Sequence, residues 1–217
     1  MRRLLLLALV PFITASAGAQ IIRPGGLRFQ EPAAWASFSA ALTQSWSVRD
    51  GSTNSQWDFG DATQYGVSLE KNLSGGASVG VRGSTSRVPL RYSGVTGGAV
   101  FFQTDADANV SQLLATLHVA NGQQLHSVLE LSAGATVYSN FRARGANTKL
   151  EPSAPDTDFT FGFGYGIGYA FSPVFSLDVV QDLITVRHQK TRLGAGDNSS
   201  VRINGTRLVA RLGLGSR

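Results

Sequence analysis

Hydrophobic and polar residues alternate along most of this 217-residue chain. The alternation is most regular in the stretch DFTFGFGYGIGYAF (residues 158–171), where every odd position is Phe, Tyr or Ile and the even positions after Asp158 are Thr, Gly or Ala. A period of two is that of a β-strand, because successive side chains point to opposite faces of a sheet. The stretch therefore predicts a strand with one strongly apolar face and one face with almost no side chains.

The same period predicts eight strands along the chain. They cover about 35–48, 61–71, 77–86, 109–119, 125–141, 158–171, 174–188 and 201–215. In the first strand, Trp46 and Val48 fall on the same face as Phe38 and Leu42. The connections alternate between long loops and short turns, with short turns at 72–76, 120–124 and 172–173, and nothing in the chain has the period of an amphipathic helix.

These features predict a transmembrane β-barrel. Transmembrane strands of about 10 residues cross a bilayer when tilted, and outer-membrane barrels have an even number of strands, short periplasmic turns and longer outer loops. A closed barrel leaves no unpaired strand edge in lipid. We expect the apolar faces to meet lipid and the polar faces to line the lumen. Eight strands leave an interior that side chains can fill, so a row of glycines would give room to long residues from other strands.

The N-terminus predicts export. Arg2 and Arg3 precede an apolar run (residues 4–13), which ends in the small residues Ala17-Gly18-Ala19. This is the layout of a cleavable signal peptide. We therefore expect a signal peptide at 1–19, a periplasmic segment at 20–34 and the barrel domain at 35–217. The formal net charge of +5 comes from basic residues spread along the chain, which does not favour nucleic acid as a partner.

With this leader, alternation and loop pattern, residues 35–215 resemble the small eight-stranded outer-membrane barrels of the opacity-protein and OmpX type. The resemblance implies an all-β, antiparallel, up-and-down transmembrane barrel in the outer membrane of a Gram-negative-type bacterium. It also implies insertion by the outer-membrane assembly machinery and contact with outer-membrane lipid and lipopolysaccharide. We expect a monomer without a cofactor.

A soluble protein is the main alternative fold. A secreted β-sandwich or lipocalin-like barrel would also alternate, with its apolar face turned inward. A strand face in water would carry several lysines, yet the chain holds only Lys71, Lys149 and Lys190, none of them in the middle of a predicted strand. The lysine distribution favours the membrane barrel.

The outer loops are expected to carry the function, since scaffold and function usually separate in this way. Loop 87–107 contains five candidates for contact with lipid or a partner protein: Arg87, Arg91, Tyr92, Phe101 and Phe102. The alternative is that its aromatic residues continue a strand or dock on the barrel rim. We expect a structural or surface-interaction role, with a narrow solute pore or a lipid-modifying enzyme as the alternatives.

Catalytic and metal-binding residues are not expected. In the segment LHSVLE, alternation places His126 and Glu130 on one face and Ser127 on the other, so no Ser–His pair forms. His118 and His126 flank a turn but offer only two metal ligands, and His188 lies at the other end of its strand.

Charged residues on the inner faces predict a network that fills the lumen. Its members are Asp178, Asp182, Arg207, Arg211, Glu130 and Arg82. If the last loop is symmetrical, Asp178 lies against Arg211 and Asp182 against Arg207, while Glu130 and Arg82 form a second cluster. A lumen filled in this way favours a scaffold over a pore.

Overall fold

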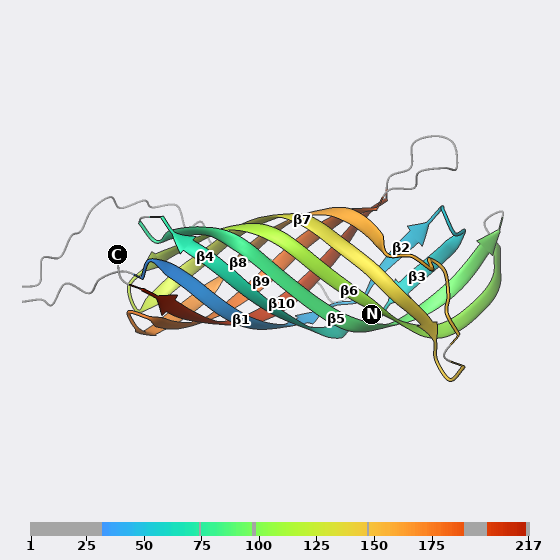
Figure 1. Ribbon diagram of the computed structural model, residues 1–217, viewed down its shortest axis with the longest axis horizontal. Helices are drawn as coiled ribbons and strands as arrows, with labels where there is room; N and C mark the ends of the chain where they lie inside the picture. The colour runs from blue at the N-terminus through green and yellow to red at the C-terminus, as the bar shows by residue number, and fades with distance from the viewer. Residues whose placement is uncertain (1–31, 74, 97–98, 147, 189–198, 216–217) are drawn as a thin grey trace, which may run out of the picture.

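The structure is a computed structural model that describes residues 32–73, 75–96, 99–146, 148–188 and 199–215. The predicted signal peptide, and most of the segment at 20–34, lie outside the described residues. In the described part the regular structure is ten β-strands (Figure 1), and no helix there is long and apolar enough to cross a membrane. The strands are β1 (Ala34–Thr43), β2 (Trp46–Asp50), β3 (Ser55–Phe59), β4 (Ala62–Asn72), β5 (Ala77–Thr96), β6 (Ala99–Gly122), β7 (Leu125–Ala143), β8 (Asp156–Ser172), β9 (Phe175–His188) and β10 (Ser199–Leu214).

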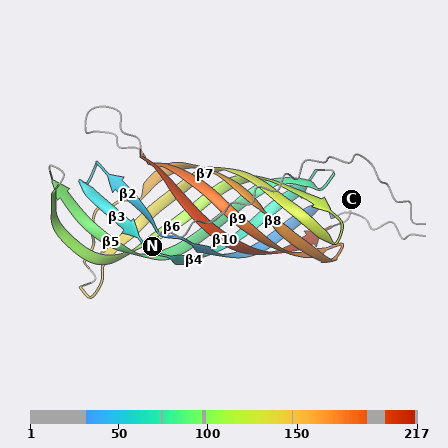
Figure 2. The ribbon, with the colours of Figure 1, turned by 180° about the vertical axis from the view of Figure 1, so that it is seen from behind.

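Eight of the strands close into a barrel. Going round the ring, the order is β1, β4, β5, β6, β7, β8, β9 and β10, and every pairing is antiparallel. The pairing of β1 with β10, from Ala34 opposite Leu214 to Thr43 opposite Gly205, closes the ring. The predicted eight-stranded antiparallel up-and-down barrel is therefore confirmed. We call the end that holds Ala34 and Leu214 the base, and the opposite end the mouth (Figures 1 and 2).

The remaining two strands form a hairpin at the mouth. β2 pairs with β3, and β3 pairs with the far part of β5, where Phe59 lies opposite Leu90. The predicted strand 35–48 is in fact two strands, interrupted at residues 44–45. The interruption shifts the alternation by one position, so that Trp46 and Val48 face inward, whereas Phe38 faces outward. The prediction that these residues share one face was wrong, because a one-residue slip exchanges the faces of a strand.

Residues 87–107 are a second correction. The described residues of this range, 87–96 and 99–107, form the far parts of β5 and β6, which remain paired from Arg87 opposite Asn109 to Thr96 opposite Ala99. The predicted loop is therefore a β-hairpin that projects at the mouth (Figures 1 and 2), and the alternative that this segment continues a strand was right. The sequence predicted a loop because charged residues take the outward positions there, so the segment has no apolar outer face.

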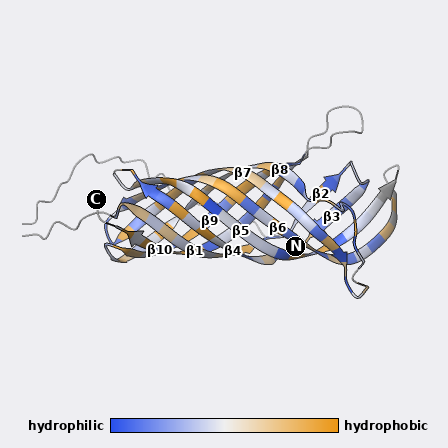
Figure 3. Cartoon of the chain, in the orientation of Figure 1, coloured by the Kyte–Doolittle hydropathy of each residue, from blue (hydrophilic) through white to orange (hydrophobic). Residues whose placement is uncertain are grey.

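The outer surface carries the expected apolar belt. The odd residues of the stretch 159–171 are all exposed, from 41% for Phe163 to 63% for Ile167. Similar exposed apolar residues occur on the other strands of the ring, and hydropathy alternates along the strands (Figure 3). Such a belt is the lipid-facing surface of a transmembrane barrel.

The glycine face of β8 points into the lumen, as predicted. A β-carbon at Gly164 would lie 3.0 Å from Asp182 Oδ1, and one at Gly168 would overlap the His126 ring and the Asp178 carboxylate. Glycine at these positions therefore makes room for charged groups that arrive from neighbouring strands.

The larger of two apolar core clusters among the described residues lies in the mouth half of the lumen, and the smaller consists of Val128, Val180 and Val209. We call five aromatic members of the larger cluster the aromatic plug: Trp46, Trp57, Phe59, Tyr138 and Phe141. Trp57 is fully buried, with its ring centroid 4.7 Å from that of Phe141 and 5.7 Å from that of Tyr138. Rings from β2, β3 and β7 thus block the barrel axis beyond the apolar belt.

Replacement of Gly168 by Ala should destabilise the folded barrel by about 1–3 kcal/mol, because the added methyl overlaps His126 and Asp178. Gly83→Ala is the matched control, since a β-carbon there meets no atom within 4 Å. Urea unfolding of the refolded proteins in lipid vesicles, followed by tryptophan fluorescence, measures both. Equal stability of the two variants would contradict the packing described here.

Candidate functional site

A buried charge network crosses the middle of the lumen. Arg207 on β10 donates from Nε to Asp182 Oδ2 at 2.7 Å and from Nη2 to Glu130 Oε1 at 2.9 Å. Arg82 on β5 donates to the same oxygen of Glu130. All four side chains are at most 10% exposed. The predicted contacts of Asp182 with Arg207 and of Glu130 with Arg82 are confirmed, and Glu130 joins them into one network.

The predicted contact between Asp178 and Arg211 was wrong. Arg211 donates from Nη2 to Glu70 Oε2 on β4 at 2.6 Å, and its Nη1 lies 2.8 Å from His118 Nε2 on β6. Asp178 instead accepts a hydrogen bond from His126 Nε2 at 3.0 Å.

The error in register was two residues. β9 and β10 pair Arg207 with Val180 and Arg211 with Ser176, whereas the symmetrical loop had placed an aspartate opposite each arginine. A two-residue slip keeps every side chain on its predicted face, so both residues of the failed pair still point inward. In a narrow lumen an inward arginine reaches strands that are not its neighbours, which sequence pairing along one hairpin cannot show.

The network leaves almost no free space around it. The cavity among Glu70, Arg82 and Arg211 measures about 10 Å³, about the volume that one water molecule needs. Towards the mouth, Gln112 donates to Thr136 at 3.3 Å, and Thr136 shares a hydrogen bond of 2.7 Å with Thr160. The lumen is thus closed first by charges, then by hydrogen-bonded polar side chains, and finally by the aromatic plug.

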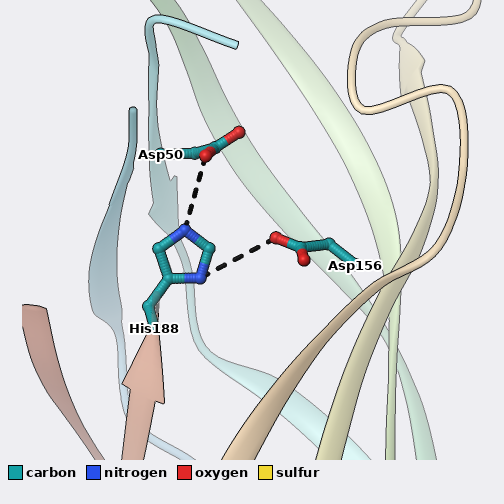
Figure 4. Close-up of side chains that lie close together, drawn as sticks. All are labelled: Asp50, Asp156 and His188. Atoms are coloured by element: carbon teal, nitrogen blue, oxygen red, sulfur yellow. Dashed lines mark ion pairs between the residues drawn. The ribbon is translucent and has the colours of Figure 1, made fainter. Parts of the chain in front are cut away.

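A second group of titratable side chains lies at the mouth, and we call it the mouth cluster: Asp50, Asp156, Asp158 and His188 (Figure 4 shows all but Asp158). His188, the last residue of β9, lies with Nδ1 2.7 Å from Asp158 Oδ2. Its Nε2 lies 3.6 Å from Asp50 Oδ1, and its Nδ1 lies 3.8 Å from Asp156 Oδ2. The imidazole also packs edge-on against the Trp57 ring, with the two ring centroids 5.6 Å apart, so the mouth cluster contacts the aromatic plug.

The mouth cluster lies beyond the apolar belt, because the residues that face outward beside it are polar, such as Thr157 and Arg187. Burial alone would lower the pKa of His188, but the hydrogen bond to Asp158 and the nearby carboxylates of Asp50 and Asp156 raise the pKa to about 9. Burial, with the charges of Asp158 and Asp50, raises the pKa of Asp156.

Hydrogen bonds lower the pKa of Asp50. Burial acts in the opposite direction, but the nearby imidazole of His188 and the hydrogen bonds from Thr53 and Ser52 outweigh it. The mouth cluster thus combines one imidazole with three carboxylates in a half-closed site.

Sequence reasoning missed the mouth cluster. It considered His188 only as a partner for the other two histidines, which lie near the base. The available signal was the pair of aspartates, Asp156 and Asp158, two positions apart on the inner side of β8. Asp50 gave no such signal, because the interruption between β1 and β2 decides which way it points.

The five predicted loop contacts separate into different environments. Arg87 and Arg91 are exposed, and Arg87 lies 3.4 Å from Asp107, which also pairs with Arg144. Phe102 is 45% exposed, whereas Tyr92 is buried against the aromatic plug and cannot serve as a surface contact. The side chain of Phe101 lies outside the described part of the structure.

The residues considered for catalysis are separated as expected. His126 is buried against Asp178, while Ser127 is exposed and donates to the carbonyl of Asn121 at 3.3 Å. His118 and His126 do not face each other, since His118 lies beside Arg211 and Glu130.

Glu70→Gln and Arg211→Met should each destabilise the barrel by about 3–5 kcal/mol, because each leaves a buried charge without its partner. The double variant should lose clearly less than the sum of the two. Thermal unfolding of the refolded barrel, followed by the shift of its band on a gel, measures the cycle.

The control cycle is Asp107→Asn with Arg144→Met. This pair has a similar N–O distance, 2.7 Å against 2.6 Å, but its arginine is half exposed. Its coupling should stay below about 1 kcal/mol, as for surface ion pairs. Additive effects of the Glu70 and Arg211 substitutions would rule out the lumen pair.

Comparison with known proteins bears on the fold. No family model matches the chain, and no curated protein matches its sequence. The crystal structure of Neisserial surface protein A matches with a TM-score of 0.51 and 13% identity, over 84% of this chain and 97% of the other. Ail from Yersinia pestis gives a TM-score of 0.43 with 14% identity, over 82% of this chain and 99% of its own. OprG from Pseudomonas aeruginosa gives 0.41 with 11% identity, over 85% and 95%. The chain thus has the fold of the small eight-stranded outer-membrane β-barrels of the opacity-protein and OmpX type.

Proposed function

We propose that this protein is a non-conducting barrel of the bacterial outer membrane that holds a projecting β-sheet at the cell surface for interaction with lipid or a partner. The observation that carries the proposal is the closed lumen. The charge network around Glu130 and the aromatic plug around Trp57 block the axis at two separate depths. A barrel closed in this way acts through its surface rather than through its interior.

The apolar belt supports membrane insertion. Its exposed residues would be costly in water, whereas a bilayer core about 30 Å thick buries them without cost to the backbone, whose polar groups pair within the closed sheet. By the rule that longer loops lie outside the cell, the mouth faces outward. The arginines beyond the belt, including Arg87 and Arg144, are then placed to meet lipopolysaccharide phosphates. Asp107 forms ion pairs with both and neutralises part of their positive charge.

The projecting hairpin of β5 and β6 supports a role in surface interaction. It extends beyond the ring (Figure 1) and exposes Arg91, Val100 and Phe102. Exposed apolar side chains next to charge are common in sites that bind proteins or lipid surfaces. The proposal is non-enzymatic, because Ser127 and His126 point to opposite faces of β7 and no Ser–His pair forms between them.

A narrow solute pore is the rival function, and conductance separates the two. Purified protein in planar bilayers should give no stable single-channel steps at any tolerated voltage, because both lumen layers would have to move for ions to pass. A general porin, reconstituted under the same conditions, is the positive control. Reproducible voltage-tolerant steps that scale with salt would refute the closed barrel.

Cysteine labelling tests which end of the barrel faces outward. The chain has no cysteine, so single substitutions give a clean background. Phe102→Cys should react with a membrane-impermeant maleimide on intact cells, since the mouth faces outside. Leu131→Cys lies on the belt and is more exposed, at 55% against 45% for Phe102, but it should remain unlabelled because lipid covers it. Labelling of Phe102→Cys only after cell lysis would reverse the orientation.

A further inference from the structure

The imidazole of His188 has one nitrogen that the protein leaves without a hydrogen-bond partner. The side chain is 1% exposed, and Nδ1 is held by Asp158 at 2.7 Å. Nε2 is buried and makes no hydrogen bond to any residue that the structure describes. A buried polar atom in this state costs free energy unless a ligand satisfies it.

Nε2 points towards a carboxylate at a distance that does not suit a hydrogen bond. It lies 3.6 Å from Asp50 Oδ1 (Figure 4), whereas N–H···O bonds measure about 2.7–3.2 Å. Two ligands held about 2.1 Å from one tetrahedral metal ion lie about 3.4 Å apart. The separation therefore fits two ligands of a shared ion better than it fits a direct bond.

A third carboxylate lies nearby, on the Nδ1 side of the ring, where Asp156 Oδ2 is 3.8 Å from Nδ1 (Figure 4). One ligand atom from each of Asp50, Asp156 and His188 lies within 4.8 Å of the others. The Asp156 side chain is 34% exposed, so it offers an ion a route from outside.

The surroundings hold two of these ligands in place. Asp50 accepts hydrogen bonds from Ser52 and Thr53, including one of 2.6 Å from Thr53 Oγ1. The contact of Asp158 with Nδ1 is of the kind that orients metal-binding histidines, because it fixes the tautomer that leaves Nε2 free.

The charge of the mouth cluster also favours a cation. Three carboxylates surround one imidazole, so the cluster keeps a net negative charge even when the imidazole is protonated. Imidazole with carboxylates suits divalent ions of the zinc group, whereas calcium and magnesium prefer oxygen ligands alone.

We propose that Asp50, Asp156 and His188 form a binding site for a divalent transition-metal ion of the zinc class at the mouth of the barrel. Sequence reasoning did not predict a metal site, because it considered only the histidines as ligands. The ligands come from the ends of β2, β8 and β9, so a bound ion ties the β2–β3 hairpin to the barrel wall beside the aromatic plug. The site goes beyond the scaffold role and does not depend on it.

Isothermal titration of tag-free, chelator-treated protein in detergent with ZnCl₂ tests the site. Wild type should bind one Zn²⁺ per chain, and Asp156→Asn should weaken binding at least about tenfold through loss of a ligand. Asp156 is partly exposed, so this variant should fold, which heat-modifiability on a gel confirms. Asp105→Asn removes an exposed carboxylate outside the mouth cluster and should bind as wild type does.

Cobalt gives a second readout that does not depend on affinity. Co²⁺ added to wild type should produce the visible absorption bands of a low-coordinate site with a nitrogen ligand, and His188→Gln should lose them. Equal Zn²⁺ binding by wild type and Asp156→Asn, or no binding of one ion per chain by folded wild type, would overturn the proposal.

Discussion

The narrow width of an eight-stranded barrel is the constraint on which the rest of this structure depends. Such a ring leaves an interior that side chains fill completely, so each inward residue has to fit against residues from the opposite wall. β8 meets this constraint with glycines, and Gly168 makes room for His126 and Asp178. Because the filled lumen excludes bulk water, each buried charge also needs a partner, and Glu130 serves two arginines at once.

The change of environment along the barrel axis explains why its interior has two parts. Within the apolar belt, β5 turns Val81 towards lipid and Arg82 into the lumen. Beyond the belt the same strand turns Leu90 inward and Arg91 outward, because water now surrounds the wall. One unbroken strand thus exchanges the polarity of its two faces where lipid gives way to water, and the larger apolar core forms in the mouth half.

At the mouth, apolar rings and titratable side chains lie next to each other. The interruption between β1 and β2 turns Trp46 inward and allows the β2–β3 hairpin to carry Trp57 to the barrel axis. It also brings Asp50 beside His188, next to an apolar core that strengthens electrostatic interactions. The plug that closes the lumen and the cluster that is suited to a cation therefore depend on the same short hairpin.

The sequence by itself determined the barrel, its strand number and the face on which most residues lie, because a period of two assigns faces wherever a strand is unbroken. It also placed Asp182 and Arg207 together, since both belong to one hairpin. Only the tertiary structure decided the partners of Arg211 and the assembly of the mouth cluster. Contacts across a lumen join strands far apart in the chain, and a register shift of two residues, or a break such as that at 44–45, leaves no mark in local alternation.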